Sequence, residues 1–166
     1  MGIRNSAKAL ILNDDGSKVL LNKSKNSLGE MWQEYPQGMI YYDLPGGGQN
    51  QYETLEEAVK RECLEETGLT LEVDRLAAIY EEISINEKFR ESYEEYAHKI
   101  FFIFICHASN ERIASATETD LDMIGTEWVD IEDIKNIEFY PDTIKSNIDL
   151  ILNTQHLLYL GSQRKM

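Results

Sequence analysis

Residues 47–69 read GGQNQYETLEEAVKRECLEETGL, and this stretch indicates the fold more strongly than any other. Its second half carries the signals of a helix with two defined ends. Thr54, followed three residues later by Glu57, forms a capping box in which each side chain binds the main-chain N–H of the other residue. Gly68 is a natural C-terminal stop, because glycine adopts the left-handed conformation at low cost. The sequence therefore predicts a helix over residues 55–67.

The predicted helix carries three glutamates on its inward side. Four apolar residues fall within one arc of roughly 140° that should face the body of the protein, namely Leu55, Ala58, Val59 and Cys63. Glu62, Glu65 and Glu66 stand three and four residues apart and share one stripe of the helix. That stripe overlaps the inward arc, where solvated carboxylates are not expected.

Inward carboxylates at close quarters cost several kcal/mol in desolvation and mutual repulsion unless something offsets them. Arg61 is the nearest basic residue, and it is expected to project to the flank of the helix. A hard divalent cation that prefers carboxylate oxygens is the economical remedy, with Mg²⁺ the most suitable ion and Mn²⁺ an alternative. The competing interpretation is a solvated acidic face on an ordinary amphipathic helix. The inward placement favours the metal site.

The spacing of the fixed residues resembles a full Nudix box. Gly47 is followed after five residues by Glu53, and after seven more by the run Arg61-Glu62-Cys63-Leu64-Glu65-Glu66-Thr67-Gly68-Leu69. The preceding Leu44-Pro45-Gly46-Gly47 is also similar to the segment that leads into the box in this family. The one departure is Cys63, where an aliphatic residue is usual. Cysteine packs as a small hydrophobe, so the site should tolerate it.

The resemblance implies a role for each matching residue. The metal ligands, and with them the catalytic residues, would be Glu62, Glu65 and Glu66, and the Gly46 carbonyl would be a further ligand. Glu53 and Arg61 would form a pair that holds the loop against the helix. Gly47 and Gly68 would supply backbone freedom at the loop and at the end of the helix.

The resemblance also implies an activity. The family hydrolyses nucleoside diphosphates linked to another group, as well as related pyrophosphates. Water attacks phosphorus while metal ions neutralise the charge on the diphosphate oxygens. Two alternatives stay open, a housecleaning nucleoside triphosphate pyrophosphatase and a non-catalytic domain that binds a nucleotide as a sensor. The intact acidic set argues against the sensor.

The general base is not fixed by the box. The segment before Gly125 carries Glu118, Asp120 and Asp122. Some members of the family supply an extra ligand or base from this place, so each of the three acids is a candidate. A solvated loop is the more common explanation for any one of them.

Four residues outside the box are candidates for binding substrate. Arg4 and Lys8 flank the first predicted strand and could contact a phosphate, although surface positions explain them as well. Tyr41 and Tyr42 precede the glycine-rich loop. Because side chains alternate along a strand, one of them should line a pocket while the other points elsewhere.

The rest of the chain predicts strands alternating with helices. Strands are expected over 7–12, 18–22 and 39–44, one or two over 71–85, one over 99–106 that is buried on both faces, and one ending at 128–129, with 23–38 irregular. A short helix is expected over 131–136 and an amphipathic C-terminal helix over 142–160. This order predicts an α/β fold, a Nudix-type α/β/α sandwich with a mixed sheet, as one domain over 1–166.

Thirty acidic against sixteen basic residues give a net charge of −14, which disfavours nucleic-acid polymers and anionic membranes as partners. A small phosphoanhydride substrate remains compatible, because a bound divalent metal reverses the field locally. The two cysteines are far apart in sequence, so no disulfide framework is expected and a cytoplasmic location is predicted. The resemblance allows a homodimer.

Overall fold

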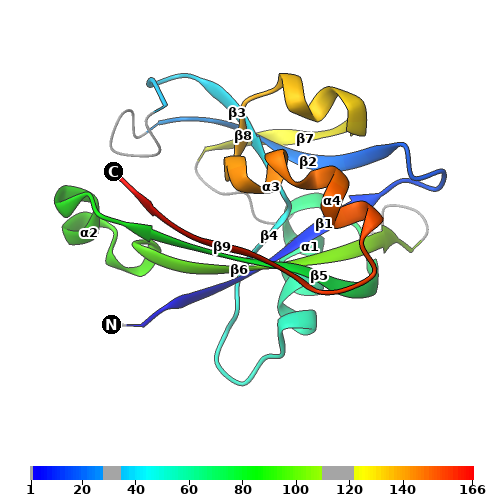
Figure 1. Ribbon diagram of the computed structural model, residues 1–166, viewed down its shortest axis with the longest axis horizontal. Helices are drawn as coiled ribbons and strands as arrows, with labels where there is room; N and C mark the ends of the chain where they lie inside the picture. Colours follow the sequence, from blue (N-terminus) through cyan, green and yellow to red (C-terminus); the bar gives the residue numbers. More distant parts are fainter. Residues whose placement is uncertain (1, 28–34, 110–121) are drawn as a thin grey trace.

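Residues 2–27, 35–109 and 122–166 are described by the computed structural model, which is shown in Figure 1. The strands are β1 (Arg4–Leu12), β2 (Lys18–Lys25), β3 (Ile40–Asp43), β4 (Gly46–Gly48), β5 (Leu71–Ser84), β6 (His98–Ala108), β7 (Met123–Asp130), β8 (Phe139–Tyr140) and β9 (Leu158–Lys165). The helices are α1 (Leu55–Thr67), α2 (Glu87–Ser92), α3 (Asp142–Ser146) and α4 (Ile148–Asn153), with short 3₁₀ helices η2 (Glu94–Tyr96) and η3 (Ile131–Asn136).

The strands form one mixed, curled sheet in the order β8-β3-β2-β1-β6-β5-β9, with β4 added to β1 and β7 added to β2. Strand β1 is central and changes partner along its length. Its N-terminal half pairs with β4 and its C-terminal end pairs with β2, while β6 runs parallel along its whole length. Consequently β1 and β2 diverge beyond their hairpin, and β2 continues with β3 and β7 (Figure 1).

Two hydrophobic cores cover the two faces of the sheet, because successive side chains of a strand point to opposite sides. On one face, helix α1 packs Ala58, Val59 and Cys63 against Ile11 and Phe104. On the other face, helices α3 and α4 and the helix η3 contribute the buried residues Ile134, Ile144, Ile148 and Ile151. The predicted α/β sandwich with a mixed sheet is therefore confirmed. Strand β6 supplies residues to both cores, as its unbroken apolar run predicted.

Helix α1 has the predicted bounds and ends. Thr54 and Glu57 form the capping box in both directions, and Gly68 closes the helix with a φ of 72°. The N–H of Gly68 donates to the carbonyl of Leu64, which satisfies one of the last helical carbonyls. The local sequence was thus sufficient to define this element.

The predicted helix over 142–160 is wrong. The apolar spacing holds only through α3 and α4, and the chain then becomes strand β9, which pairs in parallel with β5. Arg75 donates to the carbonyls of Ile151 and Thr154, at 3.1 and 2.6 Å, and so binds the end of α4. The main-chain groups at the edge of β5 need partners, and an added strand satisfies them where a longer helix would not.

Other differences are smaller. Strand β2 extends to Lys25, into the segment expected to be irregular, and residues 28–34 of that segment lie outside the described residues. Both cysteines are buried and unbridged. Among the described residues, no helix has the length and apolar character needed to cross a membrane.

Truncation in the core should be costly. Ile103 on β6 is fully buried in the core beneath α3 and α4. Ile103→Ala should lower the free energy of unfolding by about 2–5 kcal/mol, because the lost methyl groups leave a cavity. The exposed Ile124→Ala is the matched control and should stay within about 0.5 kcal/mol of the parent protein. Equal losses in urea unfolding of the two variants would contradict the assigned core.

Candidate active site

The glycine strand β4 lies between β1 and α1, closer to both than side chains would allow. A Cβ on Gly46, whose φ is 120°, would lie 2.2 Å from the carbonyl oxygen of Ala7. A Cβ on Gly47 would lie 2.5 Å from the carboxylate carbon of Glu62. Only glycine fits position 46, because the clash there is with the main chain, and a side chain at position 47 would displace the Glu62 carboxylate; the two glycines thus bring the main chain of the loop directly over the acidic helix.

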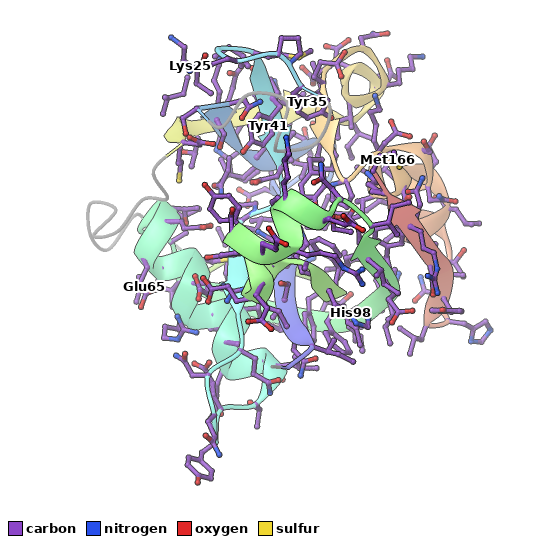
Figure 2. All side chains as sticks on the ribbon, turned by 90° about the vertical axis from the view of Figure 1, so that its left-hand side faces the viewer. Lys25, Tyr35, Tyr41, Glu65, His98 and Met166 are labelled. Carbon is purple, nitrogen blue, oxygen red and sulfur yellow. The ribbon has the colours of Figure 1, made fainter. Side chains whose placement is uncertain are left out.

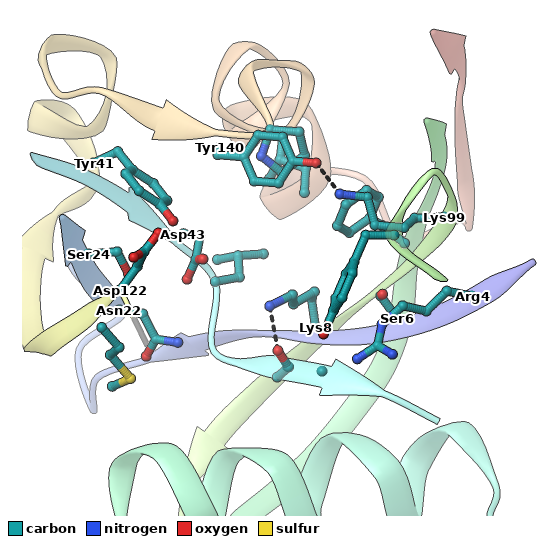
Figure 3. Close-up of a pocket in the computed structure, with 18 of the residues that line it drawn as sticks. Arg4, Ser6, Lys8, Asn22, Ser24, Tyr41, Asp43, Lys99, Asp122 and Tyr140 are labelled. Atoms are coloured by element: carbon teal, nitrogen blue, oxygen red, sulfur yellow. Dashed lines mark hydrogen bonds between the residues drawn. The ribbon is translucent and has the colours of Figure 1, made fainter. Parts of the chain in front are cut away.

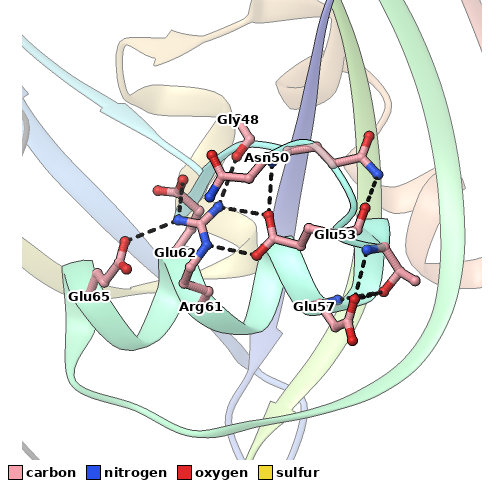
Figure 4. A network of polar contacts seen from close by, with 9 residues as sticks. Gly48, Asn50, Glu53, Glu57, Arg61, Glu62 and Glu65 are labelled. Atoms are coloured by element: carbon pink, nitrogen blue, oxygen red, sulfur yellow. Dashed lines mark hydrogen bonds and ion pairs between the residues drawn. The ribbon is translucent and has the colours of Figure 1, made fainter.

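Arg61 ties this loop to the helix (Figure 4). Its Nε and Nη2 donate to the two carboxylate oxygens of Glu53 at 2.8 and 3.0 Å, and Nη2 also donates to the carbonyl of Gly48 at 3.0 Å. Its Nη1 donates to Glu62 at 2.8 Å and to Glu65 at 3.2 Å. The expected pair of Arg61 with Glu53 is confirmed, and the contacts with Glu62 and Glu65 were not foreseen. The hydrogen bonds to Glu53, together with Glu62, raise the pKa of the guanidinium further above its usual range.

Glu66 points in the other direction, into the protein. Only 7% of the residue is exposed, and its Oε2 accepts hydrogen bonds from Asn22 Nδ2 at 2.9 Å and from the N–H of Gly46 at 2.8 Å. Burial raises the pKa of Glu66 to about 7, the nearby Asp43 adds to the rise, and the positive charge of Lys8 opposes it. The group is therefore poised to change charge near neutral pH.

The three glutamates share the predicted stripe but have different partners. Glu62 and Glu65 turn to Arg61, whereas Glu66 turns to Gly46. In the described ranges, no three His, Cys, Asp or Glu side chains are grouped closely enough to hold a metal ion. In Figure 2, Glu65 stands at the outer margin of α1. A cation would thus have to draw these side chains together.

The atoms present nevertheless suit a divalent cation. Carboxylates and a main-chain carbonyl are the hard oxygen donors that Mg²⁺ prefers. The carbonyl of Gly46 already accepts a hydrogen bond from the ammonium of Lys8, so a positive charge stands at this oxygen. Beside Glu66, Asn22 Oδ1 is a buried oxygen that lacks a hydrogen-bond partner within the described part of the chain. The oxygen donors of Glu66, Asn22 and Gly46 therefore lie close together, at a place where the ammonium of Lys8 already binds.

A cavity of about 350 Å³ opens next to β4, where β1 and β2 diverge (Figure 3). Three basic residues line it, Arg4 and Lys8 from β1 and Lys99 from β6. Asp43 and Asp122 lie on the opposite side of the cavity from Lys99 in Figure 3. Much of the remaining wall is aromatic and includes Tyr41, Tyr93, Tyr96, Phe101 and Tyr140. The cavity can therefore take a ligand with anionic and planar parts.

The residues proposed from sequence to bind substrate divide into two groups. Arg4 and Tyr41 line the cavity, and the ring of Tyr41 lies 5.7 Å from that of Tyr35 (Figure 2). Tyr42 is not part of this lining, and its hydroxyl donates to Glu127 at 3.1 Å. Alternation along β3 separates the two tyrosines.

Of the three loop acids, only Asp122 falls within the described residues. It lines the cavity, and its carboxylate accepts a hydrogen bond from the N–H of Ser27 at 3.2 Å. Glu118 and Asp120 lie outside the described residues.

Sequence reasoning missed two contacts of the basic residues. Lys8 was considered as a phosphate ligand or a surface residue, but it also binds Gly46 beside Glu66. A period-two signal existed, since Arg4, Ser6 and Lys8 place polar groups on alternate positions of a mostly apolar strand. Lys99 was treated as the start of an apolar run, and a single charge at that place was the available signal.

A sequence model of the NUDIX domain matches residues 2–148 of the chain. No curated protein matches the sequence significantly. Three similar solved structures are a NUDIX hydrolase from Nitrosomonas europaea, a MutT protein from Methanosarcina mazei and an ADP-ribose pyrophosphatase from Streptococcus suis. Their TM-scores are 0.66, 0.62 and 0.60, and their sequence identities are 19%, 24% and 17%. The matches cover 89%, 90% and 95% of this chain, and 87%, 92% and 99% of those chains. At these identities, the three structures show a shared fold.

The charge of Glu66 should destabilise the metal-free protein. Its folded-state pKa of about 7 lies above the ordinary 4.5, so the folded protein binds more protons between these values. Stability therefore falls as the pH rises from 4.5 to 7. Glu66→Gln should remove that loss and raise stability at pH 8 by up to roughly 3 kcal/mol, with little effect near pH 4.5.

Scanning calorimetry in EDTA across this pH range measures the effect. Glu56→Gln, on the exposed side of the same helix, is the matched control and should change the melting temperature little. A Glu66→Gln variant less stable than the parent at pH 8 would show that the buried carboxylate is favoured in its ionised form.

Proposed function

Since the chain belongs to the Nudix family of hydrolases, we propose that it hydrolyses a diphosphate linkage in a small nucleotide-derived substrate, using Mg²⁺. The observation that best supports this proposal is the position of β4. On one side of this strand lie the carboxylates of α1, and on the other lies a cavity lined by three basic residues. A diphosphate over the glycines would thus lie between a metal site and the cations that bind its other oxygens.

The proposed metal ligands are Glu62, Glu65, Glu66 and the carbonyl of Gly46. When bound, the cation would neutralise charge on the diphosphate oxygens and acidify the attacking water. Glu62 and Glu65 would bind both Arg61 and the cation, and Arg61 keeps the two side chains on the loop side of the helix. Glu66 is held by Gly46 and becomes fully ionised when positive charge approaches.

The cavity residues bind and orient the substrate. Lys8 lies beside Gly46 and contacts the diphosphate oxygens, and Arg4 is four residues further along the same face of β1. The glycines of β4 let phosphate oxygens approach the main chain closely. Tyr41 contributes part of the apolar wall. Asp122, which lines the cavity together with Asp43, can accept a proton from water.

A substrate panel tests this function. Nucleoside triphosphates, ADP-ribose, nucleotide sugars, dinucleoside polyphosphates and NADH are incubated with Mg²⁺ or with EDTA, and phosphate release is measured after phosphatase treatment. One class should turn over only with metal, and Glu66→Gln should lower that rate roughly 100-fold or more. Glu56→Gln should retain parental activity, since its side chain pairs with Lys60 on the outer face of α1.

Near-full activity of the Glu66→Gln variant would contradict the assignment of Glu66 as a metal ligand. If no substrate of the panel is hydrolysed, the result would favour the alternative of a nucleotide sensor. Preference for nucleoside triphosphates would identify the housecleaning alternative.

Lys8 and the cation should compete for the same oxygen. Lys8→Met removes a positive charge from the carbonyl of Gly46 and from the neighbourhood of Glu66. Without substrate, the variant should bind Mg²⁺ on the order of 10-fold more tightly, because one repulsive charge is gone. The KM for substrate should rise, since a phosphate ligand is lost. Titration calorimetry with Mg²⁺ alone checks this, and unchanged or weaker Mg²⁺ binding would contradict the shared position.

A further inference from the structure

A row of charged residues crosses the sheet at the far end of the cavity. Glu82 on β5, Lys99 on β6 and Arg4 on β1 are consecutive register partners, so their side chains share one face. Arg4 and Lys99 both line the cavity. Like charges directly opposite each other destabilise a sheet, so this pairing of two cations calls for an explanation.

Lys99 belongs to a buried polar chain with Tyr140 and Glu82. Its ammonium donates to the hydroxyl of Tyr140 at 2.5 Å (Figure 3), and that hydroxyl donates to Glu82. Both Lys99 and Lys165 lie 3.4 Å from carboxylate oxygens of Glu82. One carboxylate therefore faces two ammonium groups.

Glu82 has a second cation available besides Lys99. Lys165, from the edge strand β9, would by itself neutralise Glu82. Lys99 is only 6% exposed, and its burial lowers the pKa of the ammonium to about 8, with Lys8 and Lys165 adding to the effect. An ammonium at this place in the cavity wall offers a charged donor to an anion that enters the cavity.

The cations form a track along the cavity floor. Lys8 lies at Gly46, Arg4 at Gly48, and Lys99 one strand further at Tyr140. Gly46 and Gly48 are two positions apart on β4, so the Lys8 and Arg4 head groups beside them are separated by roughly 7 Å along the strand, about the span of one sugar unit. The rings of Phe101 and Tyr140, 6.1 Å apart, form the wall at the distal end.

We propose that Lys99 and Tyr140, with Arg4 beside them, form a second anion subsite, and that the substrate carries a further phosphate or carboxylate about one sugar unit from its diphosphate. This proposal depends on the proposed function in one respect only, namely the position of the diphosphate beside β4. The additional anion sits on either the nucleoside or the other arm of the substrate, and the chemistry of the subsite is the same in both cases.

Binding of product-like nucleotides tests the subsite without turnover. Titration calorimetry in millimolar Mg²⁺ compares AMP with adenosine 2′,5′-bisphosphate and 3′,5′-bisphosphate, and ribose 5-phosphate with ribose 1,5-bisphosphate. The first set places the extra phosphate on the nucleoside, and the second places it on a sugar without a base. In one set, the extra phosphate should tighten binding to the parent protein by roughly 10-fold or more, as expected for charge-assisted hydrogen bonds.

Lys99→Met should abolish most of that increment while retaining affinity for the monophosphate. Lys18→Met is the matched control, because Lys18 forms an exposed ion pair with Asp130 and its loss should leave the increment unchanged. Arg4→Met, at a partly exposed position, gives a second measurement if Lys99→Met does not fold.

Two results would overturn the subsite. The first is that the bisphosphates bind the parent protein no more tightly than the monophosphates, and the second is that folded Lys99→Met keeps the whole increment. Failure of the hydrolase proposal would look different, because it would leave the binding increment intact and abolish turnover of every substrate.

Discussion

The hydrogen bonds of Arg61 are the constraint on which the candidate site depends. A single guanidinium joins Glu53, the carbonyl of Gly48, Glu62 and Glu65, and so fixes the loop and the acidic face of α1 in one arrangement. Without it, the half-buried carboxylates of Glu62 and Glu65 on neighbouring helical turns would repel each other. The planar fork of arginine suits this task, since lysine lacks donors in a fixed geometry.

Glu66 illustrates a conflict between stability and function. A carboxylate with 7% exposure is unfavourable in its ionised form, and the fold tolerates it because Asn22 and Gly46 donate to it. In the proposed mechanism, the same burial makes the group respond to a nearby cation. The conflict is typical of active sites, where perturbed pKa values gather.

Strand β1 links the two functional halves of the molecule. One set of its side chains packs beneath α1 with Ala7, Ala9 and Ile11, and the alternate set lines the cavity with Arg4 and Lys8. Its change of partner from β4 to β2 is what opens the cavity. A strand that paired with β2 along its full length would close that space.

The sequence by itself determined the features encoded within a few residues. The capping box, the end of α1 at Gly68, the stripe of three glutamates and the two-faced burial of β6 all follow from local spacing. Tertiary structure decided the rest, because those contacts join residues far apart in the chain. The Lys8 bond to Gly46, the meeting of Lys99 with Tyr140 and Glu82, and the strand β9 in place of a helix depend on sheet register and on the open edge of β5. No local pattern carries that information, since register is set only when the sheet assembles.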